Sequence, residues 1–430
     1  MKKEIPLEKS YGDDHVDDHV DKEIEDCFST KNPKCFFVFA GAGSGKTRSL
    51  INTLNFLDRE QGENLLMNGK QVAVITYTNA ACDEISRRLQ YKTIFSVSTI
   101  HSFLWDLIKY YQADIKSWLV ESVQKEIEEL QRKKTKKTGS KAGEKREEKI
   151  KKKMDRLAKI RTVQKFSYNP NGDNVGYDSL SHSEVIKMST EFIATEPTMQ
   201  DILTSKYPIL LIDESQDTKK ELIDALLIVC EKYSGKFIVG MFGDTMQKIY
   251  MDGKEDLAKC IPDNWIKPVK IMNHRSAKRI VTLANSIRST VDDKKQRARD
   301  DADEGIVRLF ITSESKDKEY IEKKVAEMMA QGVKGLEFPR VMVILDDAQA
   351  KGFLFSYEKL FGVKAQSDTD IKNERDGKDT GITRTARLFY VACTRAENSL
   401  AVVAYTENEE LVKATALSNG WFLENEIYII

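Results

Sequence analysis

The feature that most constrains the fold is the stretch FVFAGAGSGKTRSL, residues 37–50. An apolar run leads into a glycine-rich turn, which is followed at once by Lys46 and Thr47. Glycines let the backbone curl so that successive N–H groups point at phosphate oxygens, and a following helix offers its positive end. The strict pattern begins with glycine, and Ala40 holds that place here, so a chance glycine turn is the rival interpretation. We expect a strand, a phosphate-binding loop and a helix.

This loop predicts contacts to a nucleoside triphosphate. Lys46 can reach the β and γ phosphates, and the hydroxyl of Thr47 can bind Mg²⁺. The predicted nucleotide-binding residues of the loop are Gly41, Ala42, Gly43, Ser44, Gly45, Lys46 and Thr47.

A pair of adjacent carboxylates follows in ILLIDESQDT, residues 209–218. An apolar run ends there in Asp213 and Glu214, and adjacent acids at the end of a buried strand are costly without a cation. We expect Asp213 to bind Mg²⁺ with Thr47, and Glu214 to orient and deprotonate an attacking water. A purely structural role is the alternative. A small-molecule kinase is disfavoured, because its acceptor is the substrate and it needs no water-activating acid.

Short apolar runs with turn signals between them predict an α/β fold. Such runs fit strands that are buried on both faces of a parallel sheet and joined by crossover helices. One set covers residues 35–40, 72–78, 208–215 and 237–244, and a later set covers residues 307–313, 341–347 and 399–406. We therefore expect two parallel-sheet lobes with a cleft between them.

Residues 101–205 interrupt the first set of runs, and we expect them to form a helical insertion. Within it, residues 131–161 carry about four basic residues for each acidic one. Two interpretations are open: a solvated helical hairpin, or a basic arm that contacts phosphates. Over the whole chain Lys plus Arg and Asp plus Glu number 68 each, so only a local patch can indicate nucleic acid.

Other classes of protein are disfavoured by what the sequence lacks. The six cysteines are scattered without CxxC or Cys/His pairing, so we expect neither a zinc site nor disulfides. No apolar run is long enough to cross a membrane, and the N-terminal residues have no apolar core of a secretory signal. We expect a cytoplasmic protein with no membrane partner.

Further motifs follow the phosphate loop in order. AGAGSGKT is followed by TYTNAACDEI, STIHSF, DESQDT, GDTMQKIY, NHRS, KGLEF and YVACTRA. This series resembles the motifs of UvrD/Rep-like helicases of superfamily 1A, and the likeness extends over most of the chain. It implies two RecA-like lobes of the P-loop NTPase class. The implied domains are 1–100 with 206–270 as the first lobe (1A), 101–205 as its helical insertion (1B), and 271–430 as the second lobe (2A).

The resemblance implies roles for residues near the γ-phosphate. Gln247 would sense this phosphate, and Gln216 and Asp217 would relay its state. Arg275 and Arg395 would act as arginine fingers that stabilise charge in the transition state. An exposed ion pair is the alternative for either arginine.

At the nucleoside, the sequence departs from the family. Glu337 of KGLEF would contact the ribose, and His274 would stack on the base in place of the family's tyrosine. The family usually has an adenine-reading glutamine before the loop, whereas the first glutamine here is Gln61. ATP as the nucleotide is therefore implied by the resemblance and not by a local reader.

On the nucleic-acid side, the resemblance implies a track for single-stranded DNA. Tyr77 would stack on bases, and Tyr250 would line the same track. Taken singly, either tyrosine would more often be a core aromatic, and only the ordered motifs favour the track. The implied DNA-binding residues are Tyr77, Thr78, Asn79, Thr99, His101 and Tyr250.

The regions around two later motifs also depart from the family. Asp252 stands where a tryptophan is common, and Gln331 stands where a histidine is expected. About 60 residues separate Asn273 from Lys334, too few for the inserted 2B subdomain of the family. We expect either that a segment between Ala330 and Gln331 is missing from this chain or that the second lobe is minimised.

Two functions remain open at this point. The first is an ATP-dependent helicase or translocase on single-stranded DNA, moving 3′ to 5′ by resemblance, with ATP and Mg²⁺, in DNA repair or anti-phage defence. The second is a nucleic-acid-sensing ATPase subunit that regulates a partner nuclease and unwinds little itself. Small UvrD-like proteins of this second kind include the helicase subunit of Gabija-type anti-phage systems, which works beside a nuclease subunit.

Overall fold

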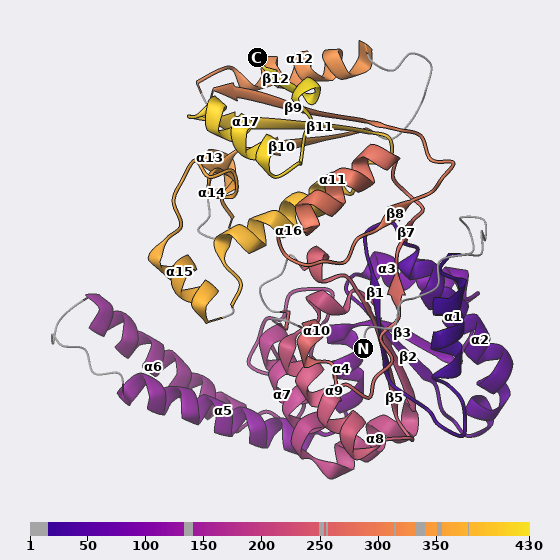
Figure 1. Ribbon diagram of the computed structural model, residues 1–430. Helices are drawn as coiled ribbons and strands as arrows, with labels where there is room; N and C mark the ends of the chain where they lie inside the picture. The colour runs from indigo at the N-terminus through magenta and orange to yellow at the C-terminus, as the bar shows by residue number, and fades with distance from the viewer. Residues whose placement is uncertain are drawn as a thin grey trace. The chain divides into compact units, whose positions relative to one another are not determined.

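Figure 1 shows the computed structural model of the chain. It describes residues 16–132, 141–248, 253–254, 257–313, 315–331, 340–350, 355–376 and 378–430. The chain divides into two compact units. The first unit holds Met1–Glu60, Ile212–Asp217 and Gly240–Ile430, and the second unit holds Gln61–Leu211 and Thr218–Val239. These units cut across the implied lobes, whose boundaries stay a prediction.

The P-loop belongs to a six-stranded sheet with the order β3-β2-β4-β5-β1-β6. Strand β1 lies next to the edge strand β6 and pairs parallel with both β5 and β6, and β2 pairs parallel with β3. Every residue of β1, β2, β4 and β5 is buried, which explains their near-continuous apolar sequences. The strands are β1 (Phe36–Ala40), β2 (Val72–Thr76), β3 (Phe95–Thr99), β4 (Ile209–Ile212), β5 (Ile238–Gly243) and β6 (Val269–Lys270).

The second sheet lies wholly in the first unit and has the order β10-β11-β9-β12. All its strand pairs are parallel, and β11 is buried along its whole length between β10 and β9. Its strands are β9 (Ile306–Ser313), β10 (Arg340–Leu345), β11 (Ser399–Thr406) and β12 (Ile427–Ile429). A short two-stranded sheet joins β7 (Met272–Asn273) and β8 (Arg297–Ala298).

Helices cover both faces of this second sheet. On one face, α11 and α16 share a large core with the strands, and the P-loop residue Ala42 and Met246 pack in that same core. On the other face, α12 packs Ile321, Val325 and Met329 against β9 and β11. The α-helices that lie wholly in the first unit, among the described residues, are α1 (Asp18–Asp26), α10 (Leu257–Cys260), α11 (Lys278–Arg288), α12 (Lys318–Gln331), α13 (Asp347–Ala350), α14 (Tyr357–Leu360), α15 (Asp368–Arg375), α16 (Gly381–Cys393) and α17 (Glu409–Ser418). Helix α2 (Lys46–Met67) begins in this unit and ends in the second.

The second unit is mainly helical. Its helices are α3 (Asn79–Arg88), α4 (Ile100–Ile108), α5 (Gln112–Arg132), α6 (Lys141–Ile160), α7 (His182–Thr195), α8 (Pro197–Lys206) and α9 (Lys220–Lys232). The start of α7 is fixed by a capping box between Ser181 and Glu184, and α8 begins with a proline in its first turn. Among the described residues, no helix is both long enough and apolar enough to cross a membrane.

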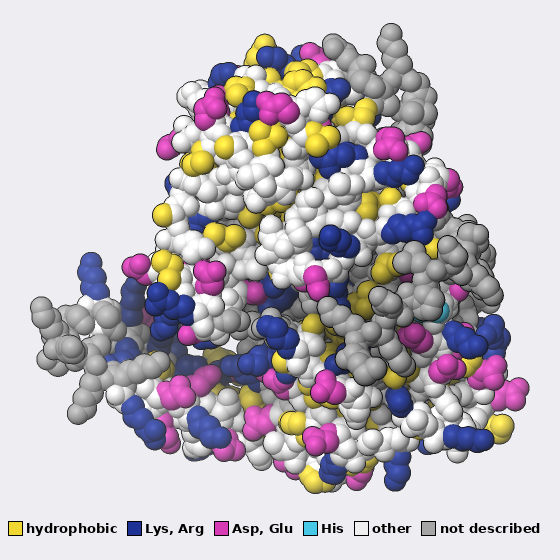
Figure 2. All heavy atoms as spheres, viewed as in Figure 1, with side chains coloured by type: hydrophobic (Ala, Val, Ile, Leu, Met, Phe, Trp, Pro, Cys, Tyr) yellow, Lys and Arg dark blue, Asp and Glu magenta, His cyan; other side chains and the backbone are white. Residues whose placement is uncertain are grey.

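Helices α5 and α6 lie side by side as a hairpin, and the basic arm predicted at residues 131–161 covers the end of α5 and the whole of α6. Figure 2 shows Lys and Arg side chains gathered along this hairpin, with acidic side chains among them. Some of these charges are paired, because Lys153 contacts Glu126 and Arg156 lies 2.7 Å from Glu184. Residues 133–140, which hold the densest basic cluster, lie outside the described residues. Both interpretations of the arm stay open.

The predicted fold class, α/β with two parallel sheets and a helical insertion, is confirmed. Each predicted apolar run contains a strand, but β3, β6, β7, β8 and β12 were not predicted. Helix α12 includes both Ala330 and Gln331, while KGLEF lies outside the described residues. A segment missing at that point therefore stays a prediction.

Candidate nucleotide site

Strand β1 delivers the glycine-rich loop, and α2 begins directly after it at Lys46. Gly43 and Gly45 have φ values of +70° and +77°, a region that residues with a side chain rarely adopt. Gly41 allows a close approach, since a Cβ at this position would lie 2.5 Å from Cδ of Gln296. The backbone conformation and the close packing therefore favour glycine at these positions. The N–H groups of the loop stand at the start of a long helix.

In the phosphate loop, Lys46 is paired with Glu214. The ammonium donates a hydrogen bond of 2.5 Å to Oε2 of Glu214, and Lys46 is buried. Burial alone would lower the pKa of Lys46, but Glu214 and Asp213 outweigh it and raise the pKa above its ordinary value. Burial would likewise raise the pKa of Glu214, but Lys46 holds that pKa below its ordinary range. The carboxylate thus occupies the position on Lys46 for which a phosphate would compete.

Glu214 sits on a strained turn after β4. Its φ of 49° lies in the left-handed region, which costs a residue with a side chain about 1–3 kcal/mol. Its backbone N–H donates to Oδ1 of the buried Asp213 over 3.0 Å. Carboxylate and hydroxyl oxygens are the ligands that Mg²⁺ prefers, and Asp213 and Thr47 carry such oxygens. The donor set fits the ion, and the assignment of both residues as ligands stays a prediction.

A chain of side-chain contacts leads from Glu214 to the predicted γ-phosphate sensor. Gln216 donates from Nε2 to Glu214 Oε2 over 2.6 Å, and its Oε1 accepts the backbone N–H of Asp244 over 3.1 Å. Asp244 then accepts a hydrogen bond of 3.2 Å from Nε2 of Gln247. Gln216 and Asp217 are both buried, so the relay predicted for them lies inside the protein.

Three residues predicted to contact nucleotide lie around the loop. The backbone N–H of His274 donates to the carbonyl of Gly43 over 2.9 Å, and Arg275 is so near that a Cβ on Gly43 would lie 2.8 Å from its Cβ. Arg395 is close enough to Glu214 to help lower the pKa of that carboxyl. Both arginines are exposed, and neither guanidinium makes a hydrogen bond or ion pair with another described residue. The role of both residues as arginine fingers stays a prediction, and the ion-pair alternative stays open.

Two predicted residues cannot be placed in this site. Glu337, predicted at the ribose, and Tyr250, predicted on the DNA track, lie outside the described residues. Their roles stay predictions.

The other DNA-binding candidates belong to the second unit. Strands β2 and β3 are parallel with Thr76 opposite Thr99, so the residues that follow both strands lie at one edge of the sheet. Tyr77 is 40% exposed, as a stacking platform requires. The hydroxyls of Thr78 and Thr99 already cap α3 and α4, so their side chains hold the edge in shape.

Two further candidates at this edge contact neighbours in the second unit. Asn79 donates to Oδ1 of Asn171 over 3.0 Å. The ring of His101 lies 4.9 Å from that of His182. Burial first, and then the charges of His182 and Lys219, lower the pKa of His101. His101 is therefore biased toward its neutral form.

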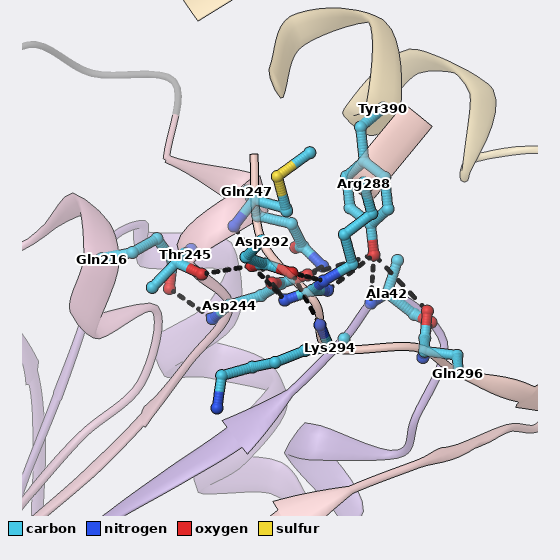
Figure 3. A network of polar contacts seen from close by, with 12 residues as sticks. Ala42, Gln216, Asp244, Thr245, Gln247, Arg288, Asp292, Lys294, Gln296 and Tyr390 are labelled. Atoms are coloured by element: carbon cyan, nitrogen blue, oxygen red, sulfur yellow. Dashed lines mark hydrogen bonds and ion pairs between the residues drawn. The ribbon is translucent and has the colours of Figure 1, made fainter. Parts of the chain in front are cut away.

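Sequence reasoning missed several residues that contact the loop. Nδ2 of Asn273 and Nε2 of Gln296 both donate to the carbonyl of Ala42, over 2.9 and 3.0 Å. Tyr390 accepts the backbone N–H of Ala42 and also contacts Arg288 (Figure 3). Asn273 and Tyr390 stand inside quoted motifs, which was a usable signal. Arg288 and Gln296 stand in no motif.

A buried strand, a glycine loop on a helix N-terminus, a loop lysine and a carboxylate pair at the end of β4 define a P-loop NTPase. A family model described as AAA domain matches residues 24–252, more than half of the chain. The chain therefore belongs to this family. The resemblance to UvrD/Rep-like helicases is confirmed by this match and by the relatives that follow.

Two kinds of curated relative are similar to the chain. "Gabija protein GajB" of Bacillus cereus (strain HuB5-5) is 27% identical over 375 residues, covering 71% of this chain and 54% of that protein. "ATP-dependent DNA helicase PcrA" of Staphylococcus epidermidis is 22% identical over 340 residues, covering 71% of this chain and 45% of that protein. The chain thus spans about half the length of the curated relatives it matches.

Solved helicase structures are also similar, at low identity. The Arterivirus nonstructural protein 10 helicase in complex with DNA has a TM-score of 0.31 and 12% identity, covering 89% of this chain and 63% of that chain. The same helicase without DNA has a TM-score of 0.32 and 12% identity, covering 91% of this chain and 62% of that chain.

Proposed function

We propose that the chain is an ATP-dependent motor on single-stranded DNA, a translocase or helicase of the UvrD/Rep-like group. The observation that carries this proposal is the line of contacts from Lys46 through Glu214 and Gln216 to Asp244 and Gln247. It connects the loop that would hold the phosphates to Gln247, the residue that we propose senses the last of them. The fit of Asp213 and Thr47 to Mg²⁺ and the family membership support the same conclusion.

The proposed reaction is hydrolysis of ATP by an activated water. The γ-phosphate displaces Glu214 from Lys46, which frees the Glu214 carboxylate to accept a proton from the attacking water. Bound Mg²⁺ would neutralise charge on the β and γ phosphates. Arg275 and Arg395, both exposed and near the loop, would stabilise the charge that develops as the phosphoryl group leaves.

The proposed DNA track uses the edge that carries Tyr77, Thr78, Asn79, Thr99 and His101. Stacking on Tyr77 would be independent of base identity, which is what a motor that moves along any sequence needs. Movement from 3′ to 5′ is proposed from the resemblance to UvrD/Rep-like helicases. We propose a cytoplasmic role in DNA repair or anti-phage defence.

A direct test combines hydrolysis with strand separation. ATP hydrolysis should rise when single-stranded DNA is added, and Lys46→Ala should reduce it by about 100-fold or more, since the loop lysine anchors the phosphates. A duplex with a 3′ tail should be unwound and one with a 5′ tail should not. The control is Lys70→Ala, which changes a half-buried lysine beyond the end of α2. A rate of ATP hydrolysis that is unchanged in the Lys46→Ala variant would refute the proposal.

A second candidate function is an ATPase subunit that senses nucleic acid and regulates a partner nuclease. The similarity to Gabija protein GajB favours it, as does Asp252, which cannot stack where the family often has tryptophan. In that case hydrolysis would still need DNA and Lys46, but duplexes with either tail would stay intact. Co-purification with a nuclease encoded next to this chain would then be expected. A chain that unwinds alone and as a monomer would exclude this alternative.

A further inference from the structure

A buried polar network surrounds Arg288, the last residue of α11 (Figure 3). Its guanidinium is 5% exposed and reaches three partners at once. Nη2 lies 2.9 Å from Oδ1 of Asp244, whose side chain is fully buried. Nε and Nη2 grip Asp292 over 2.6 and 3.0 Å, and Nη1 lies 3.4 Å from the hydroxyl of Tyr390. None of these three partners was expected from the sequence to meet Arg288.

The hydroxyl of Tyr390 connects this network to the phosphate loop. It accepts the backbone N–H of Ala42 and Nη1 of Arg288, each over 3.4 Å, which uses both of its lone pairs. Its single proton can then go to Oδ2 of Asp244 at 3.2 Å or to Oε1 of Gln296 at 3.4 Å. The carboxylate is the closer and the charged acceptor, so we assign the proton to Asp244.

Asp244 is the point at which the network meets the sensors. One of its oxygens accepts the backbone N–H of Met246, and the other accepts Nε2 of Gln247. Its own backbone N–H donates to Gln216, which in turn holds Glu214. The carboxylate of Asp244 therefore holds Gln247, the predicted sensor, and the backbone N–H of the same residue holds Gln216, the predicted relay.

A second contact keeps the same turn in place. Thr245 donates from Oγ1 to Oδ2 of Asp292 over 3.1 Å, and Asp292 is the carboxylate that grips Arg288. Arg288 therefore holds the Asp244–Gln247 turn at two points. It contacts Asp244 directly, and it reaches Thr245 through Asp292. A planar guanidinium can bridge two carboxylates in fixed geometry, whereas an ammonium cannot.

We propose that Arg288 is a positioning residue for hydrolysis: it fixes Asp244, and through Asp244 it aligns Gln247 and Gln216 with the γ-phosphate and with Glu214. Arg288 touches neither the loop lysine nor the predicted magnesium ligands, so its role is distinct from that of Arg275 and Arg395. The inference rests on the proposed function, because it assumes that the loop binds and hydrolyses a nucleoside triphosphate.

A specific kinetic signature follows. Without the bridge, Gln247 and Gln216 lose their fixed geometry, while Lys46 and the loop that bind the nucleotide are unchanged. The maximal rate should therefore fall while the affinity for ATP is nearly kept. A displacement of about 1 Å in a catalytic arrangement can lower a rate by about 100-fold.

The experiment compares lysine substitutions of two arginines on α11 in the full chain. Arg279 is the matched control, since it also grips one carboxylate with two nitrogens, Glu426 over 2.7 Å, but it has no contact with the network. Arg288→Lys should lower kcat for DNA-stimulated ATP hydrolysis by about 10- to 100-fold, with KM for ATP changed by less than about 3-fold. Arg279→Lys should change kcat by less than about 2-fold. Thermal unfolding shows whether both variants are folded.

Each outcome decides something. Equal kcat values for Arg288→Lys and wild type would overturn the inference, as would a fall in kcat that Arg279→Lys reproduces. If Arg288→Lys does not fold, Tyr390→Phe is used instead, because it removes only the hydroxyl that connects the loop to Asp244; unchanged kcat would overturn the inference. A wild-type chain without ATP hydrolysis, or with hydrolysis that survives Lys46→Ala, would refute the proposed function itself.

Discussion

At the scale of single residues, Glu214 supplies the negative charge that balances the buried ammonium of Lys46. Lys46 would be costly to bury alone, and the side chain of Glu214 is about one-third exposed, so the pair is stabilising but partly screened by water. The pKa of Glu214 lies below its ordinary value of 4.5 because Lys46 outweighs burial. A carboxylate with a depressed pKa adds stability above about pH 4.5, and this stability is lost as the pH falls through the folded-state value.

Glu214→Gln should therefore lower the free energy of unfolding of the nucleotide-free chain by about 1–2 kcal/mol at pH 7. The difference from wild type should shrink in acid, because protonation removes the same charge from the wild-type protein. Urea unfolding at pH 7 and near pH 3 measures both values. The control is Glu84→Gln, whose exposed pair with Arg88 should contribute at most about 0.5 kcal/mol. A deficit that stays constant with pH would contradict the argument.

At the scale of elements, α16 connects the hydrophobic core to the phosphate loop. Phe389 is fully buried and forms a ring cluster with Phe361 and Trp421, with centroid distances of 6.0 and 5.8 Å. The next residue, Tyr390, turns its hydroxyl to Ala42. Packing of one side chain thereby fixes the rotation of the helix that places the other.

Phe389→Ala should lower the free energy of unfolding by about 3–5 kcal/mol, because it leaves a cavity among aromatic rings that cannot easily close. Leu388→Ala, on the half-buried side of the same helix, should cost less than half of that. Urea titrations of the three proteins provide the comparison. Equal losses would mean that the ring cluster does not hold α16.

The limits of sequence-based prediction also appear at this scale. Strands with all residues buried, such as β1 and β5, were predicted because apolar runs mark them. β3 was missed because its FSVST sequence is only partly buried and carries three hydroxyl side chains. β12 was missed because it is only three residues long and lies next to the last residue of the sequence. Hydrophobic periodicity does not identify a strand that is short or only partly apolar and that forms because a neighbouring strand offers it backbone hydrogen bonds.

In the candidate site, too, some residues could be predicted from the sequence and others could not. Lys46, Asp213 and Glu214 were predicted because their chemistry needs those residues next to an apolar strand. Arg288 could not be predicted, since an arginine four residues before Asp292 has the spacing of an ordinary ion pair on a helix surface. Only the fold brings Asp244 to the same guanidinium.

At the scale of the whole molecule, the two candidate sites fall in different compact units. The first unit draws the loop from Met1–Glu60, the carboxylates from Ile212–Asp217, and the sensor and arginines from Gly240–Ile430. The described DNA-binding candidates all belong to the second unit, Gln61–Leu211 with Thr218–Val239. The candidate nucleotide site is assembled from three stretches that are distant in the sequence, so it depends on the folding of the first unit. Binding of nucleotide and binding of DNA would therefore be detected at different segments of the chain.

Hydrogen exchange can test this division. A non-hydrolysable ATP analogue with Mg²⁺ should slow backbone exchange in the loop at 41–47, at 212–217 and around Asp244, because a ligand that binds only the folded state suppresses local opening. Single-stranded DNA alone should slow exchange after β2 and β3, at 77–79 and 99–101. Lys46→Ala should remove the first effect and leave the second, because Lys46 lies outside the DNA edge. Protection by the analogue that is confined to the second unit would show that the nucleotide does not bind at the loop.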